Sequence, residues 1–205
     1  MNLIKIGKEL GELHKMQTIN LDFHSKARVW LKDSPSIIYP ALDIITLDMI
    51  TKDIQTGLAC KPGSRQTALE IIIPVGPRVC YGLLGAEFIP NNLGKLSVEV
   101  RVSTENESIF PSSIAAEFDT VKIGLPEEYS QSVIDGIVNS LNNQMIQTLG
   151  SGIIKIEQAA HGEISSSKKM FRNIAATVIQ LLLLDQVSPQ EEVTEIVKTY
   201  GLASK

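Results

Sequence analysis

The pattern of apolar and polar positions predicts two amphipathic helices in the second half of the chain, with a strand between them. The first helix, residues 126–150, carries one apolar stripe and one polar side, as a helix with a single buried face does. A strand at 153–159 and a serine triplet at 165–167, which can cap a helix, follow. Residues 188–191, Ser-Pro-Gln-Glu, form a capping-box pattern and predict a closing helix. The second helix is predicted to bury Phe171, Ile174, Val178, Leu181 and Leu182.

Shorter periodicities predict strands in the first half of the chain. Segments 68–75, 79–88 and 95–103 are rich in β-branched residues or alternate apolar with polar residues. Residues 15–31 and 115–124 are also predicted to be extended, with Ile19, Leu21 and Phe23 alternating with polar neighbours. Evenly spaced strands followed by helices predict an α+β fold, with a mostly antiparallel sheet and helices packed on one face.

The clearest polar linker of the first half covers residues 57–66 and contains Pro62, Gly63 and Ser64. It predicts a boundary between an N-terminal extension of uncertain structure, residues 1–65, and a main domain, residues 66–205, on which the extension is expected to pack. Within the extension, residues 2–15 fit a short helix, and residues 42–55 fit either a strand or a helix.

One segment also carries a family resemblance. Residues 124–137, GLPEEYSQSVIDGI, place a proline three residues before a tyrosine and open an apolar helix with a glycine late in it. Residues 152–176 continue with a strand, a turn, paired serines and a helix that opens with an apolar-Phe-x-x-Ala pattern. In this order, segment 123–184 resembles the fourth domain of translation elongation factor G and of the tetracycline-resistance ribosomal protection factors. Residues 79–103 fit the family's sheet more loosely.

That resemblance implies a βαβ unit with a left-handed crossover. In elongation factors the tip of this domain enters the decoding region of the ribosome, which implies a ribosomal partner here. The glycine-rich basic loop of the family's tip is replaced by the neutral segment 88–96, FIPNNLGKL. The resemblance therefore carries over the fold and not the tip residues.

Composition narrows the possible partners and compartments. The formal net charge of -4 argues against broad, non-specific binding to nucleic acid, which depends on many Lys and Arg residues. No apolar run reaches the roughly 18 residues that a membrane span needs, and the N-terminus lacks the pattern of a secretory signal. The two cysteines, Cys60 and Cys80, are too few for a disulfide framework. We therefore expect a cytoplasmic protein with no membrane partner.

Candidate binding residues lie around the turn before the second helix. His161 and Glu163 could form a proton-transfer pair, although a histidine in such a turn is commonly exposed and idle. The Ser-x-x-Lys spacing at 165–168 lacks the companion elements of serine acyl-enzymes, so that helix capping explains the serines. One basic cluster could contact RNA or an acidic partner, or could simply be a solvated helix face. It comprises Lys168, Lys169 and Arg172.

The sequence contains no P-loop and no Cys-x-x-Cys or His-x-x-x-His spacing, so we expect no cofactor and no metal site. Together with the resemblance, this predicts a non-enzymatic binding or assembly module whose partner is the ribosome, RNA or another protein. Two alternatives stay open. One is a small enzyme with an unrecognised site near residues 161–169, and the other is a homo-oligomeric structural protein.

Overall fold

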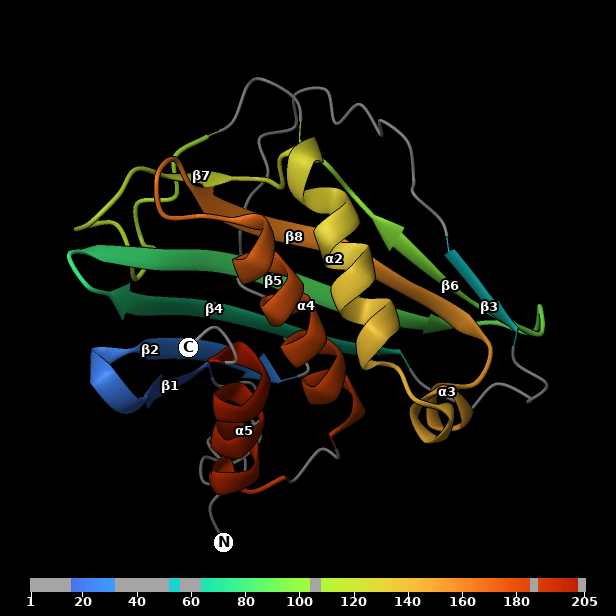
Figure 1. Cartoon of the computed structure of the whole chain (residues 1–205). Helices are drawn as coiled ribbons and strands as arrows, with labels where there is room; N and C mark the ends of the chain where they lie inside the picture. Colours follow the sequence, from blue (N-terminus) through green and yellow to red (C-terminus); the bar gives the residue numbers. More distant parts are fainter. Residues whose placement is uncertain (1–15, 32–51, 56–63, 104–107, 185–187, 203–205) are drawn as a thin grey trace, which may run out of the picture.

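The computed structural model describes residues 16–31, 64–103, 108–184 and 188–202, and the backbone of residues 52–55. Within these ranges eight strands form one sheet, in the order β1-β2-β4-β5-β8-β6-β3, and β7 pairs with the end of β8 (Figure 1). The strands are β1 (Gln17–Asn20), β2 (Lys26–Leu31), β3 (Lys52–Gln55), β4 (Arg65–Val75), β5 (Arg78–Pro90), β6 (Lys95–Val100), β7 (Val121–Ile123) and β8 (Gly152–Gly162).

The sheet is antiparallel except where β6 and β8 lie side by side in parallel, with Val98 opposite Ile154. Between them the chain crosses over one face of the sheet in α2 (Glu127–Ser140). In Figure 1 strands β6 and β8 both run toward the left, and α2 lies in front of them. When the picture is turned so that both strands point upward, β8 lies to the left of β6. The crossover is therefore left-handed, against the strong general preference for right-handed βαβ units.

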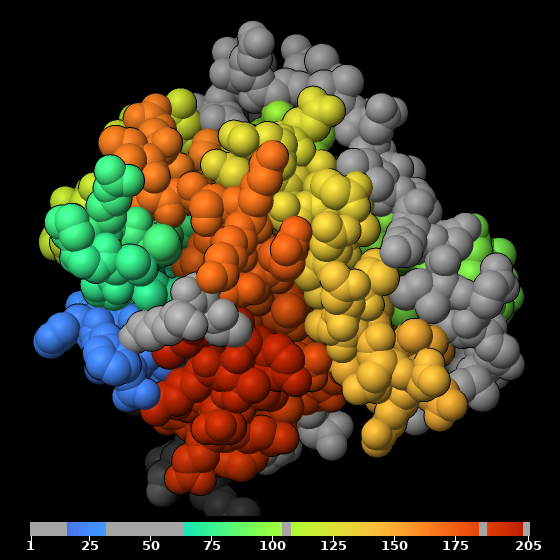
Figure 2. Space-filling model, in the orientation of Figure 1, coloured from blue at the N-terminus to red at the C-terminus, as the bar shows by residue number. Residues whose placement is uncertain are grey.

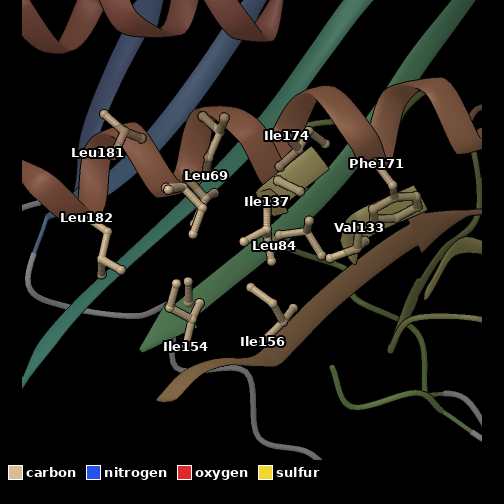
Figure 3. Close-up of a cluster of buried hydrophobic side chains, with 14 of the residues drawn as sticks. Leu69, Leu84, Val133, Ile137, Ile154, Ile156, Phe171, Ile174, Leu181 and Leu182 are labelled. Atoms are coloured by element: carbon tan, nitrogen blue, oxygen red, sulfur yellow. The ribbon is translucent and has the colours of Figure 1, made fainter. Parts of the chain in front are cut away.

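The α-helices of the described ranges pack on one face of this sheet, and the predicted α+β class is confirmed. Helix α2 lies beside α4 (Lys168–Leu183); α3 (Asn143–Leu149) follows α2 in the chain, and α5 (Gln190–Ile196) follows α4. Apolar residues alternate along the strands and meet the helix stripes in one continuous core (Figure 3). That core includes Leu69, Leu84, Ile154, Ile156, Val133, Ile137, Phe171, Ile174, Leu181 and Leu182.

The opposite face of the sheet carries a second, smaller core. Residues 108–120, here called the cover segment, run over this face between β6 and β7. Ala115 of the cover segment packs with Trp30, Ile72 and Leu83, which alternate with first-core residues along their strands. Both faces of the sheet are therefore buried around β4 and β5.

Two predicted elements are interrupted in the structure. The helix predicted over 126–150 breaks at Leu141, which is extended, and α3 begins anew after Asn142. The Asn142 side chain accepts a hydrogen bond from the Met145 amide at 2.9 Å, so an N-cap competes with helix continuation. The strand predicted over 115–124 is wrong for most of its length, because residues 111–119 form turns and only β7 pairs.

Two further predictions are also wrong in detail. Phe23 does not point inward. It lies in a tight turn with φ 58°, and 72% of its surface is exposed. The capping box at 188–191 is not formed, because Pro189 is the N-cap of α5 and no side chain bonds there. In contrast, Ser167 caps α4 by accepting from the Met170 amide at 3.2 Å, as the serine triplet predicted.

Strands β1, β2 and β3 precede the predicted boundary at residue 65 and belong to the same sheet as the later strands. The helix predicted at residues 2–15 and most of the segment 42–55 lie outside the described residues, as does Cys60. No helix within the described ranges is long and apolar enough to cross a membrane.

Candidate functional site

The structure separates the two members of the predicted proton-transfer pair. His161 is buried, with 7% of its surface exposed, and its Nδ1 lies 3.1 Å from the carbonyl oxygen of Gly124. The Glu163 carboxylate instead pairs with Nζ of Lys122 on β7 at 2.8 Å. His161 therefore helps to hold the connection from β7 to α2, and this arrangement offers no exposed base.

The predicted basic cluster lies on the first two turns of α4. Lys168, Lys169 and Arg172 are all exposed there, as expected for a solvated helix face. Arg172 pairs with Asp135 of α2 at 3.6 Å, so its charge is partly neutralised within the fold. Lys168 and Lys169 lie next to the turn that joins β8 to α4.

A buried carboxylate fastens the cover segment to the sheet. Glu70 of β4 is fully buried, and its Oε1 accepts from the Tyr81 hydroxyl at 2.9 Å and from the Ile114 amide at 3.0 Å. Its Oε2 lies 3.2 Å from Nη1 of Arg28, which also donates to the carbonyl oxygen of Ser112 at 2.7 Å. Burial, and then the charge of Glu70, raise the pKa of Tyr81, so that Tyr81 stays protonated and donates.

A second carboxylate fastens the cover segment to the turn before α4. Oδ2 of Asp119 accepts from the Ser165 hydroxyl at 2.6 Å, the Ser165 amide at 2.8 Å and the Ile164 amide at 3.0 Å. A Cβ atom at Gly162 would collide with Asp119 and Ser165, so this close approach requires glycine. Ser166 holds the same turn to β5 by donating to the Tyr81 carbonyl oxygen at 2.8 Å.

The carboxylates of Glu70 and Asp119 hold a set of turns at one end of the sheet, here called the loop end. The register brings together the β1–β2 turn (21–25), the β4–β5 turn (75–78), the cover segment and the β8–α4 turn (162–167). In Figure 2 the blue, green and orange turns follow one another along the left margin of the molecule. Segments far apart in sequence therefore form one surface.

Exposed apolar side chains gather at the loop end. Among the described residues, seven large apolar side chains are exposed, and five of them lie on these turns. The other two are Met16, before β1, and Leu93, in the β5–β6 turn, both away from the loop end. A single exposed apolar residue is ordinary, but several on one surface indicate a binding surface. The five are Phe23, Val75, Ile109, Phe118 and Ile164.

No protein-family model matches the sequence, and no curated protein matches it. Both anchoring carboxylates are turned inward onto donors of the chain itself. They can position loops, but in this arrangement neither is presented to a substrate.

The sequence carries only a partial signal for these features. Glu70 interrupts the apolar run of residues 68–75, and a charge inside such a run indicates a buried pair. Nothing nearby in the sequence identifies Arg28 as its partner, 42 residues earlier. Asp119 lies in a segment whose pattern predicts a strand, so its role in a turn cannot be read from periodicity.

A shallow hollow lies on the sheet face opposite the helices, and it gives no support for a substrate pocket. It lies at the β-bulge after Gly85 and has a volume of about 50 Å³. Its lining includes Glu87, Lys155 and Glu157 and does not include the segment 161–169, the alternative location for a catalytic site.

We predict that the contribution of Asp119 to stability disappears in acid. Partial burial raises the pKa of Asp119, but the bonds from Ser165, Ile164 and Thr120 outweigh it and leave that pKa below the usual 3.8. A depressed carboxyl pKa stabilises the fold above the unfolded-state pKa, and this contribution is lost as pH falls through the folded-state pKa. Asp119→Asn should therefore cost about 1 kcal/mol at pH 7 and progressively less below pH 3.8. Urea unfolding of both proteins across this range measures the difference, and a difference independent of pH would contradict the prediction.

Proposed function

We propose that this chain is a non-enzymatic binding module that docks a protein partner through the loop end. The observation that carries the proposal is the placement of five of the seven exposed large apolar side chains of the described residues on adjacent turns of that end. Removal of these exposed apolar side chains from water by a partner is favourable and contributes to the free energy of binding.

The rigidity of the loop end supports the same proposal. Ile164 is 84% exposed, yet its own amide is bonded to Asp119, immediately after Phe118 in the chain. Phe118 is itself held by a bond from its amide to the Ala115 carbonyl oxygen at 2.9 Å. Side chains presented by an ordered backbone lose little conformational entropy on binding, which favours affinity.

Segment 123–184 resembles the fourth domain of elongation factor G, and this resemblance favours a partner on the ribosome. Such a partner is a ribosomal protein or another component bound to the ribosome. Co-sedimentation of the purified chain with ribosomes tests the ribosomal partner separately, and an absence of salt-sensitive association would exclude it.

Site-specific photocrosslinking tests the docking surface directly. We expect a photoreactive phenylalanine analogue at position 118 or 164 to crosslink to a defined partner protein in the cells that make this chain. Leu93 is the matched control, because it is 70% exposed on the turn at the opposite end of the sheet. The same analogue at position 93 should give no specific product.

The crosslinked protein must then bind the purified chain, and Phe118→Ser with Ile164→Ser should abolish this binding while Leu93→Ser leaves it unchanged. Crosslinks that are equal at positions 93, 118 and 164, or absent at 118 and 164, would contradict the proposal. A crosslink to a second copy of the chain would instead identify a homo-oligomer.

A further inference from the structure

The charges around the loop end differ in sign from the charge of the whole chain. The chain has a formal net charge of -4, yet exposed cations lie on both sides of the apolar turns. Lys26 begins β2, Arg78 begins β5, and Lys168 and Lys169 begin α4. These three strand and helix starts adjoin the β1–β2, β4–β5 and β8–α4 turns respectively.

The acidic residues at this end are mostly engaged within the chain. Asp22 pairs with Lys198 at 3.3 Å, and Glu163 pairs with Lys122 at 2.8 Å. Asp119 points onto the Ser165 and Ile164 amides. Among the described acidic residues of these turns, Glu117 remains exposed to solvent. Over the described turns alone, without the exposed Glu127 and Glu128 that begin α2 beyond β7, the accessible charge is therefore positive.

From this charge distribution we infer that the docked partner is an acidic protein segment that carries large apolar residues. The inference rests on the proposed function and specifies its partner. Apolar anchors would fill the surface around Phe118 and Ile164, while flanking Asp or Glu residues would face Lys168 and Arg78. Charge complementarity of this kind accelerates association and excludes basic partners.

The alternatives fit the surface less well. RNA binding depends mainly on cations along a backbone track and on stacking platforms, whereas three of the five exposed apolar side chains here are aliphatic. An anionic lipid surface would accept the cations and the apolar tips together. It is therefore tested as a separate outcome with vesicles of phosphatidylcholine and phosphatidylserine.

Selection from a random peptide library tests the inference while the natural partner is still unidentified. The library is panned on the full purified chain and depleted on the Phe118→Ser, Ile164→Ser double variant. We expect the selected peptides to combine Phe, Trp, Leu or Ile with several Asp or Glu residues. Each charge reversal, Arg78→Glu or Lys168→Glu, should weaken their binding by up to about fivefold at low salt. Lys95→Glu, at the opposite end of the sheet, should leave binding unchanged.

The outcomes separate this inference from the proposed function. Selected peptides that need Phe118 and Ile164 but show no acidic enrichment, and no response to Arg78→Glu or Lys168→Glu, would overturn the acidic partner and leave the docking surface intact. A failure to select any peptide that distinguishes the double variant, together with the absence of crosslinks at 118 and 164, would overturn both. Binding to anionic vesicles that is lost in the double variant would replace the protein partner with a membrane surface.

Discussion

Replacement of Glu70 by alanine is expected to lower the free energy of unfolding by about 3–5 kcal/mol. The fully buried carboxylate accepts from the Tyr81 hydroxyl and the Ile114 amide, and it pairs with Arg28. Its removal leaves the Tyr81 hydroxyl and the Ile114 amide without that acceptor, and leaves Arg28, which is 27% exposed, without its carboxylate. Urea unfolding, followed by the fluorescence of Trp30, measures the loss. Trp30 is the sole tryptophan and is buried in the second core, so its emission also reports detachment of the cover segment.

Two further variants provide reference values for the stability loss of Glu70→Ala. Glu70→Gln keeps the shape and one acceptor oxygen but loses the charge opposite Arg28, so its cost should lie below that of alanine. Glu163→Gln breaks the exposed ion pair with Lys122 and should cost less than about 1 kcal/mol. If Glu70→Ala were no more destabilising than Glu163→Gln, the proposed anchoring of the cover segment by Glu70 would be wrong.

The same position connects stability to binding. Glu70 lies under the cover segment and contacts Ile114, whereas Phe118 lies further along the same segment and faces solvent. A folded Glu70→Gln protein should therefore keep its apolar loop-end residues but hold them less rigidly. Its affinity for the selected peptides should fall because the segment must then be ordered on binding.

Features that depend on neighbouring residues are predicted well from this sequence, and features that depend on residues far apart in the chain are not. The strands at 68–75 and 79–88 and the helix from 168 to 183 follow from local periodicity, and the structure confirms them. The break at Leu141 escapes prediction because the apolar stripe continues through it to Met145, and Met145 is buried in the core from α3. The periodicity of apolar residues indicates which face of a helix is buried, but it does not indicate where the helix ends.

The loop end is the part that local patterns could least predict. Phe23 continues the alternation of Ile19 and Leu21, so its apolar character indicates burial until the left-handed turn at Phe23 and His24 is known. The gathering of turns at one end arises from strand pairing between residues up to about 80 positions apart, such as Leu83 with Ala160. Such pairing is fixed by the whole sheet, and the composition of no single turn specifies it.

Gly136→Ala is expected to destabilise the protein by about 1–3 kcal/mol, although alanine is the better helix former. In α2 a Cβ atom at this position would collide with the carbonyl oxygen of Arg172 and lie 3.0 Å from Cβ of Ala175. Both contacts are on α4, so a methyl group must push the two helices apart. The helix propensity gain of about 1 kcal/mol acts in the opposite direction, and the expected sign means that the close crossing outweighs it.

The crossing also positions the first turn of α4, because Arg172 lies one turn after Lys168. Gly136→Val should cost more than Gly136→Ala, since its extra methyl groups enlarge the same collision. Asn139 is the matched control: it is exposed on α2, and Asn139→Ala should change the free energy of unfolding by no more than about 0.5 kcal/mol. A stabilising effect of Gly136→Ala in urea unfolding would show that the two helices can separate at little cost. The glycine would then be dispensable for the position of Lys168 and Lys169 beside the loop end.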